Sequence, residues 1–172
     1  MKRLGSVIAL CCMVMLMFVT SCGDRPMTAA DGLHLGAVIG LIKNAQHGEE
    51  FERLLNQPQG VNNLDLDGDL IIDFIHIQEY QGMEFRGYSL TVHMPDQSIQ
   101  EIAKIEIKQG MTGYHIQAHG NPQIYGPNYF VTSHVGHNAI VPFVAWAFMP
   151  RHVIYVTPTY QYGYYPSWYV AP

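Results

Sequence analysis

Residues 88–118 read YSLTVHMPDQSIQEIAKIEIKQGMTGYHIQA. Apolar and polar residues alternate in three runs of this stretch, and the turn sequences Pro95-Asp96 and Gln109-Gly110 separate the runs. Such alternation is typical of strands that bury only one face, and short turns between them are typical of antiparallel neighbours. The stretch therefore predicts three consecutive strands of an antiparallel sheet. Their apolar faces are formed by Tyr88, Leu90, Val92 and Met94, by Ala103, Ile105 and Ile107, and by Tyr114, Ile116 and Ala118.

The residues before this stretch predict one more strand and two helices. Residues 71–80 form the first strand, which ends at the turn Gln81-Gly82, so the sheet is expected to be a four-stranded meander. Residues 35–45 carry apolar side chains at helical spacing, and the glutamates within 49–52 suit the start of a second helix because the helix dipole favours negative charge there. The predicted fold class is α+β, with an N-terminal helical hairpin packed on the four-stranded antiparallel meander.

The C-terminal third predicts a short helix, a strand and an aromatic C-terminal extension. Residues 139–149 are strongly apolar and are expected to form a buried helix, with Asn138 as its cap and Pro142 in its first turn, where a proline is tolerated. Residues 152–157 are expected to form a further strand. The Tyr- and Pro-rich residues 158–172 are expected to be irregular.

The first 21 residues resemble the signal peptide of a bacterial lipoprotein. Two basic residues precede an apolar run over residues 7–19, which is shorter than the roughly 20 residues that a membrane-spanning helix needs. The run ends at Val19-Thr20-Ser21-Cys22, which is similar to a lipoprotein processing box. Cys22 would then carry the lipid anchor. An ordinary signal peptide and a weak membrane anchor are the alternatives.

Cleavage before Cys22 would leave a tether over residues 22–32 and a single domain over residues 33–157. Seven of the nine basic residues would remain against 14 acidic ones, and the net charge would move from −5 to −7. This balance argues against nucleic acid as a partner, because nucleic-acid binding requires a basic face. Cys11 and Cys12 would also be lost, so the exported domain would depend on its core or on a metal rather than on disulfides.

Residues 65–73, DLDGDLIID, place aspartates at alternate positions of a predicted loop. Calcium prefers six to eight oxygen ligands, and such spacing brings several carboxylates around one point. The predicted ligands of a structural calcium ion are Asp65, Asp67, Asp69, the carbonyl of Ile71, and Asp73. Leu70 occupies a position where glycine is usual, which has a steric cost if the turn needs a positive φ. The alternative is a metal-free turn held by hydrogen bonds from the aspartates to the backbone.

The histidines do not follow a recognisable metal-site pattern. His115 and His119 are four residues apart on one strand, and His134 and His137 flank a glycine. Neither pair has the spacing of zinc proteases, and we interpret them as exposed side chains of polar faces. The carboxylates of Glu84, Glu101 and Glu106 receive no catalytic role, and no catalytic residue is predicted.

The aromatic extension allows two interpretations. Tyrosine and tryptophan are favoured at interfaces, so these side chains are a candidate surface for a protein or a glycan. Alternatively, they pack over the sheet of their own domain as a strand or coil, or form a disordered tail. The residues concerned are Tyr160, Tyr162, Tyr164, Tyr165, Trp168 and Tyr169.

Residues 33–126 resemble a family of Gram-negative envelope lipoproteins whose members have no assigned activity. The resemblance is carried by EFERLLN at 50–56, GVNNLDLD at 60–67, DFI at 73–75, IAKIE at 102–106 and IYG at 124–126. The aspartate loop is also similar to the D-x-D-x-D-G-x-x-D loops of integrin-type propeller repeats and, more loosely, to the EF-hand loop.

The resemblance implies a lipid-anchored protein of the cell envelope, and Gly23 after Cys22 favours the outer membrane. The leading functional hypothesis is a calcium-stabilised, non-enzymatic binding or scaffold module whose partner is an envelope protein or glycan. The alternatives are a metal-dependent envelope hydrolase that uses histidines and carboxylates, and a purely structural envelope protein.

Overall fold

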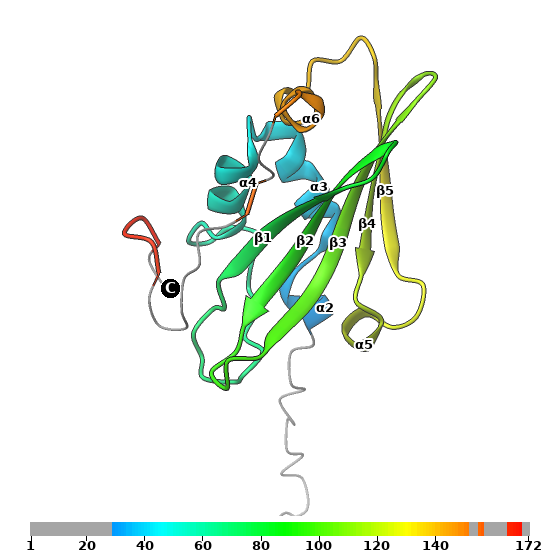
Figure 1. The fold of residues 1–172 in the computed structure, drawn as a ribbon. Coiled ribbons are helices and arrows are strands. Elements are labelled where there is room, and N and C mark those ends of the chain that lie inside the picture. Colours follow the sequence, from blue (N-terminus) through cyan, green and yellow to red (C-terminus); the bar gives the residue numbers. More distant parts are fainter. Residues whose placement is uncertain (1–28, 152–154, 157–164, 170–172) are drawn as a thin grey trace, which may run out of the picture.

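The computed structural model describes residues 29–151, 155–156 and 165–169. A five-stranded antiparallel sheet runs through this part of the chain, and each strand pairs with its neighbours in sequence, in the order β1-β2-β3-β4-β5 (Figure 1). The strands are β1 (Ile75–Gln81), β2 (Phe85–His93), β3 (Ile99–Gly110), β4 (Gly113–Gly120) and β5 (Phe130–Gly136). The predicted class of helices combined with an antiparallel sheet is confirmed.

The prediction of four strands was wrong by one, because β5 was not anticipated. Its inward side carries Ser133 opposite Ile116, and Val135 is the one buried residue of this strand, so the apolar alternation is weak there. The first strand also begins later than predicted. Residues 71–74 belong to the preceding loop, where the Asp73 amide donates to the Leu64 carbonyl oxygen at 2.7 Å.

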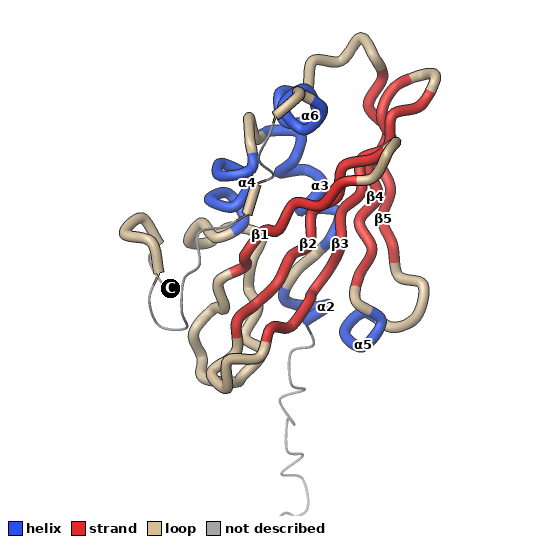
Figure 2. Tube along the Cα trace, in the orientation of Figure 1, coloured by secondary structure: helices blue, strands red, loops and turns tan. Residues whose placement is uncertain are grey.

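The longer helices cover one face of the sheet, as the blue and red segments of Figure 2 show. They are α3 (Leu35–Asn44), α4 (Gly48–Leu55) and α6 (Pro142–Phe148), and the single-turn helices are α2 (Ala29–Gly32) and α5 (Pro122–Tyr125). Helix α3 contacts α4, α6, β4 and β5, and α4 contacts β1. No helix in the described part of the chain has both the length and the apolar character that crossing a membrane requires.

The predicted helical hairpin is matched only in part. Helices α3 and α4 lie where two helices were expected and contact each other, but α6 also packs on α3 in the same layer. Helix α6 is shorter than the predicted 139–149. Its N-cap is Val141 rather than Asn138, and Pro142 lies in the first turn, as predicted.

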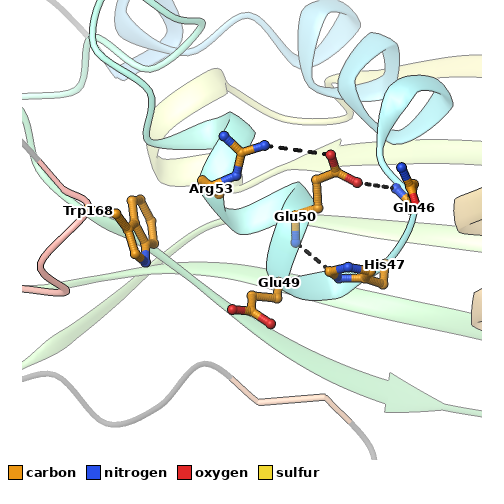
Figure 3. Close-up of a pocket in the computed structure, with 6 residues that line it drawn as sticks. All are labelled: Gln46, His47, Glu49, Glu50, Arg53 and Trp168. Atoms are coloured by element: carbon orange, nitrogen blue, oxygen red, sulfur yellow. Dashed lines mark hydrogen bonds and ion pairs between the residues drawn. The ribbon is translucent and has the colours of Figure 1, made fainter.

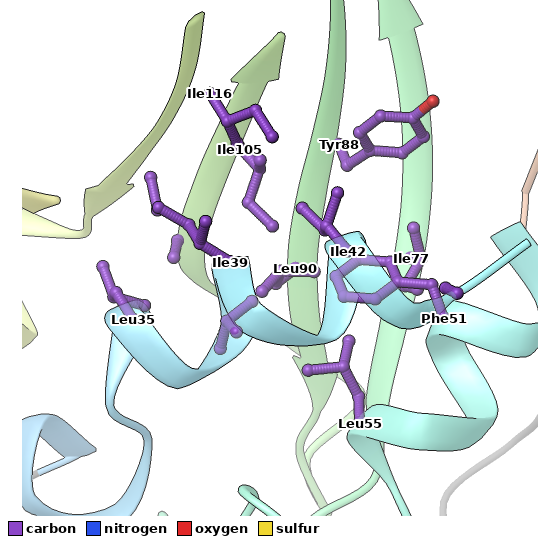
Figure 4. Close-up of a cluster of buried hydrophobic side chains, with 14 of the residues drawn as sticks. Leu35, Ile39, Ile42, Phe51, Leu55, Ile77, Tyr88, Leu90, Ile105 and Ile116 are labelled. Atoms are coloured by element: carbon purple, nitrogen blue, oxygen red, sulfur yellow. The ribbon is translucent and has the colours of Figure 1, made fainter. Parts of the chain in front are cut away.

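The core lies between the helices and the inward face of the sheet (Figure 4). Helix α3 contributes side chains spaced three and four residues apart, which meet alternate residues of the strands. Phe51 of α4 packs edge-to-face on Phe143 of α6, with ring centroids 5.4 Å apart. Fully buried members of this core are Leu35, Ile42, Phe51, Leu55, Tyr88, Leu90, Ile105 and Ile116.

The outward face of the sheet carries polar side chains, including exposed Lys104, Lys108, His115 and His134. Beyond α6, Tyr155 and Val156 lie along the edge of β1. The Glu79 amide donates to the Tyr155 carbonyl oxygen at 2.8 Å, and Val156 forms a bridge with Gln78.

Several predictions concern residues outside the described ranges. These are the leader, Cys22, most of the tether, residues 152–154 and 157 of the predicted last strand, and Tyr160, Tyr162 and Tyr164 of the extension. The last four residues of the predicted tether form α2.

Candidate metal-binding loop and aromatic groove

The aspartate loop lies between α4 and β1, and two buried asparagines hold its ends. The Asn56 amide group bonds both backbone groups of Ile75, accepting from the N–H at 2.8 Å and donating to the carbonyl at 2.9 Å. Asn62 donates to the Asp73 carbonyl oxygen at 2.7 Å and accepts from the Leu64 amide at 3.0 Å. Both asparagines are 3% exposed. The loop therefore projects from a fixed base.

Three of the predicted ligands come together at the exposed tip of the loop. One carboxylate oxygen each of Asp65, Asp67 and Asp69 lies within 4.8 Å of the others. All three are partly or fully exposed. This oxygen-only group is the arrangement that a hard cation such as Ca²⁺ prefers.

The same carboxylates also accept hydrogen bonds from the loop backbone. Asp65 accepts from the amides of Gly68 at 2.8 Å and Leu70 at 3.1 Å. Asp67 accepts from the Asp69 amide at 3.1 Å. Asp69 accepts from the Ile71 amide at 2.8 Å. These are the hydrogen bonds from aspartate side chains to the backbone that an aspartate-rich turn is expected to form, and they define the shape of the loop.

Leu70 adopts the backbone conformation that glycine favours. Its φ is 69°, close to the 78° of Gly68, and its side chain is 90% exposed. A left-handed conformation costs a residue with a Cβ about 1–2 kcal/mol. Leucine in place of glycine at position 70 therefore keeps the turn but adds a conformational free-energy cost.

Asp73 was predicted as a ligand but does not join the three clustered carboxylates. It is 6% exposed, and its Oδ2 accepts from the Leu66 amide at 2.6 Å. Burial raises the pKa of Asp73 to about 6, and the nearby negative charges of Asp67, Asp65 and Asp69 act in the same direction. Asp73 thus lies beneath the loop tip, where it ties the start of the loop to its end.

The described part of the aromatic extension packs beside this loop. Tyr165, Trp168 and Tyr169 surround Phe74, with ring centroids 5.8, 5.8 and 5.0 Å away. The Tyr169 hydroxyl donates to the Ile72 carbonyl oxygen at 2.7 Å, and burial raises the pKa of Tyr169 to about 12. These three residues thus contact their own domain, as in the interpretation of the extension as a coil that packs on the domain.

A groove of about 410 Å³ separates the extension from α4 (Figure 3). Trp168 forms one side and is 37% exposed. On the other side, Arg53 pairs with Glu50 at 3.6 Å, while Glu50 also accepts from the Gln46 amide at 2.9 Å. An aromatic ring facing carboxylates and a guanidinium can stack on a sugar ring or a peptide group and bond its polar atoms. The lining residues are Gln46, His47, Glu49, Glu50, Arg53 and Trp168.

His115 and His134 are exposed on the outward face of the sheet, and Glu101 and Glu106 bond neighbouring polar side chains. Glu101 accepts from the Ser89 hydroxyl at 2.7 Å, and Glu106 pairs with Lys108 at 2.8 Å. His115 lies opposite His134 of the adjacent strand, and His119 lies opposite Phe130. This cross-strand neighbour could not be read from spacing within one strand.

A buried ion pair was not anticipated from the sequence. Glu79 is 1% exposed, pairs with Arg151 and accepts from the Tyr155 amide at 2.7 Å. The Arg151 guanidinium also lies over the Trp146 ring, 3.7 Å from its centroid. The only signal for this pair was a glutamate at an inward position of the predicted first strand. These contacts hold Arg151 and Tyr155 against β1.

No protein-family model, no curated protein and no solved structure matches this chain.

Proposed function

We propose that this chain is a lipid-anchored, calcium-stabilised, non-enzymatic binding module of the bacterial cell envelope, and that its anchor is Cys22 in the outer membrane. The observation that supports calcium binding is that one carboxylate oxygen each of Asp65, Asp67 and Asp69 lies within 4.8 Å of the others. The leader and its processing box support the anchor and the export.

The donor set fits a hard divalent cation. Three carboxylates at this separation repel each other by about 1 kcal/mol per pair even in water, and a divalent ion between them converts repulsion into attraction. The oxygen ligands suit calcium better than a metal that prefers sulfur or imidazole. Asp65, Asp67 and Asp69 would hold the ion, and backbone carbonyls or water would complete its shell.

The ion would act on the binding groove through contacts that run from the loop to the extension. Ile72 lies at the end of the loop and accepts the hydrogen bond of Tyr169. Phe74, two residues further on, packs against Trp168 at one wall of the groove. Stabilisation of the loop by calcium would therefore stabilise the position of Trp168 opposite α4. The proposed partner is an envelope protein or glycan that places a ring or a peptide group on Trp168.

Site-specific crosslinking in native envelopes tests this function. A photo-crosslinking residue at Glu49, in the groove, should give a discrete adduct that Trp168→Ala and calcium chelation both diminish. The same residue at the exposed Thr132, on the opposite edge of the sheet, is the matched control. Identical adducts from both positions, or none from position 49, would contradict the proposal.

A further inference from the structure

The outward face of the sheet carries two histidines from neighbouring strands. His115 of β4 lies directly opposite His134 of β5, the strand at the edge of the sheet (Figure 1). Residues opposite each other on antiparallel strands project from the same face, with Cβ atoms about 5 Å apart. The two imidazole centroids are 4.7 Å apart, and the ring planes are inclined by 50°. The rings are therefore close, on one face, and not parallel.

Both imidazoles are available to a ligand from solvent. Each is exposed, and within the described residues neither ring forms a hydrogen bond that would occupy a ring nitrogen. Gly110 leaves room for the His115 ring, because a Cβ at that glycine would lie 3.3 Å from its Cδ2. Lys108, the neighbour of His115 on β3, pairs with Glu106 at 2.8 Å, so a carboxylate already balances the nearest ammonium charge.

We propose that His115 and His134 chelate one divalent transition-metal ion of the Cu²⁺ or Ni²⁺ type. A metal–imidazole bond of about 2.0–2.1 Å places the ion about 3.2 Å from each ring centroid. Two such rings at a right angle around the ion have centroids about 4.5 Å apart, whereas a tetrahedral angle requires about 5.2 Å. The observed 4.7 Å lies between these two values, so both rings can reach one ion, and among the divalent ions that accept imidazole ligands Cu²⁺ and its neighbour Ni²⁺ bind most tightly.

The remaining ligand positions belong to water or to another molecule. Among the described residues, the clustered carboxylates of the aspartate loop are the one group of three or more candidate ligand atoms close enough to share an ion. The histidine pair is thus a two-ligand site that is open on the solvent side. It differs from the calcium loop in its donor atoms, its place in the fold and the kind of metal that it suits.

A second histidine pair lacks the geometry for chelation. His76 and His93 have centroids 4.2 Å apart, but their planes differ by only 25° and the rings are stacked. The lone pair of an imidazole lies in the plane of its ring. The lone pairs of two stacked rings therefore lie in nearly parallel planes and do not converge on one ion. His76 is also 6% exposed. His119, on the same face as His115, has Phe130 as its cross-strand neighbour. His93 and His119 therefore provide matched control positions.

Titration with Cu²⁺, followed by electron paramagnetic resonance, tests the proposal. The probe is added to the full chain, purified without a histidine tag and with calcium in excess. The first equivalent should show coupling to two imidazole nitrogens. His115→Ala and His134→Ala should each lower the affinity about 100-fold and leave at most one coupled nitrogen from this pair. Because both side chains are exposed, neither variant removes a core contact.

The controls His119→Ala and His93→Ala should keep the two-nitrogen signal and the affinity. A two-nitrogen signal that survives in both His115→Ala and His134→Ala would overturn the proposal. A wild-type affinity no tighter than that of the single variants would overturn it as well. Circular dichroism of each variant checks that the sheet is retained.

Discussion

Replacement of Leu70 by glycine is expected to stabilise the protein, although it removes a large apolar side chain. The left-handed φ of 69° costs leucine about 1–2 kcal/mol. Glycine removes that cost, but its greater conformational freedom in the unfolded chain destabilises the folded state by about 0.5–1 kcal/mol. The Leu70 side chain is 90% exposed, so its truncation loses only about 0.2 kcal/mol of burial. The net expectation is a gain of about 0.5 kcal/mol in the free energy of unfolding.

Urea unfolding with and without calcium measures this gain, which corresponds to about 1–2 °C in the thermal midpoint. Gln97→Gly is the matched control, because Gln97 has a φ of 67° in an exposed turn outside the loop. Both variants should gain similar stability. The calcium affinity of Leu70→Gly should stay within about threefold of wild type, because the hydrogen bonds that Asp65 accepts from the backbone define the turn with either residue. A loss of stability in Leu70→Gly alongside a gain in Gln97→Gly would refute this reasoning.

Three further predictions concern charge and anchoring. Burial, assisted by His93, lowers the pKa of His76 to about 4 from 6.5, so the unfolded chain binds a proton that the folded chain excludes. Stability should therefore fall by up to about 3 kcal/mol as the pH drops from 6.5 to 4, and His76→Leu should reduce this slope in urea titrations at several pH values. Glu79→Gln should cost roughly 3 kcal/mol because it leaves Arg151 without its buried partner, whereas the control Glu106→Gln, at a partly exposed carboxylate, should cost less than about 1 kcal/mol in the same assay. Cys22→Ser should abolish labelling by palmitate and release the chain from membrane fractions, and unchanged labelling would refute the anchor.

Much of the sheet was predictable because its strands bury only one face. In residues 88–118 the inward positions are almost all apolar, so alternation marks β2, β3 and β4 clearly. Strand β5 was not predicted, because Ser133 faces inward and Phe130 faces outward, so apolar and polar residues do not alternate regularly there. The start of β1 was also misplaced, since the apolar residues 71–72 belong to the loop rather than to the strand.

The candidate site was predictable only where its residues are close in sequence. Asp65, Asp67 and Asp69 fall in one loop, so their spacing alone indicated a shared point. The hydrogen bonds by which Asn56 and Asn62 hold the ends of the loop depend on the path of the chain, because Asn56 bonds Ile75 from 19 positions away. The His115–His134 pair depends on the register between two strands, one of which was not predicted. Such contacts follow from topology and cannot be read from local patterns.

Direct measurement of calcium binding tests the central claim that the aspartate loop holds an ion. Isothermal titration of the full chain should give one Ca²⁺ per chain, and calcium at 100 times its dissociation constant should raise the free energy of unfolding by about 2.7 kcal/mol. Asp67→Asn should abolish both effects, while Glu84→Gln, an exposed carboxylate outside the loop, should preserve them. The absence of calcium uptake by the wild-type chain, or equal uptake by Asp67→Asn, would contradict the account.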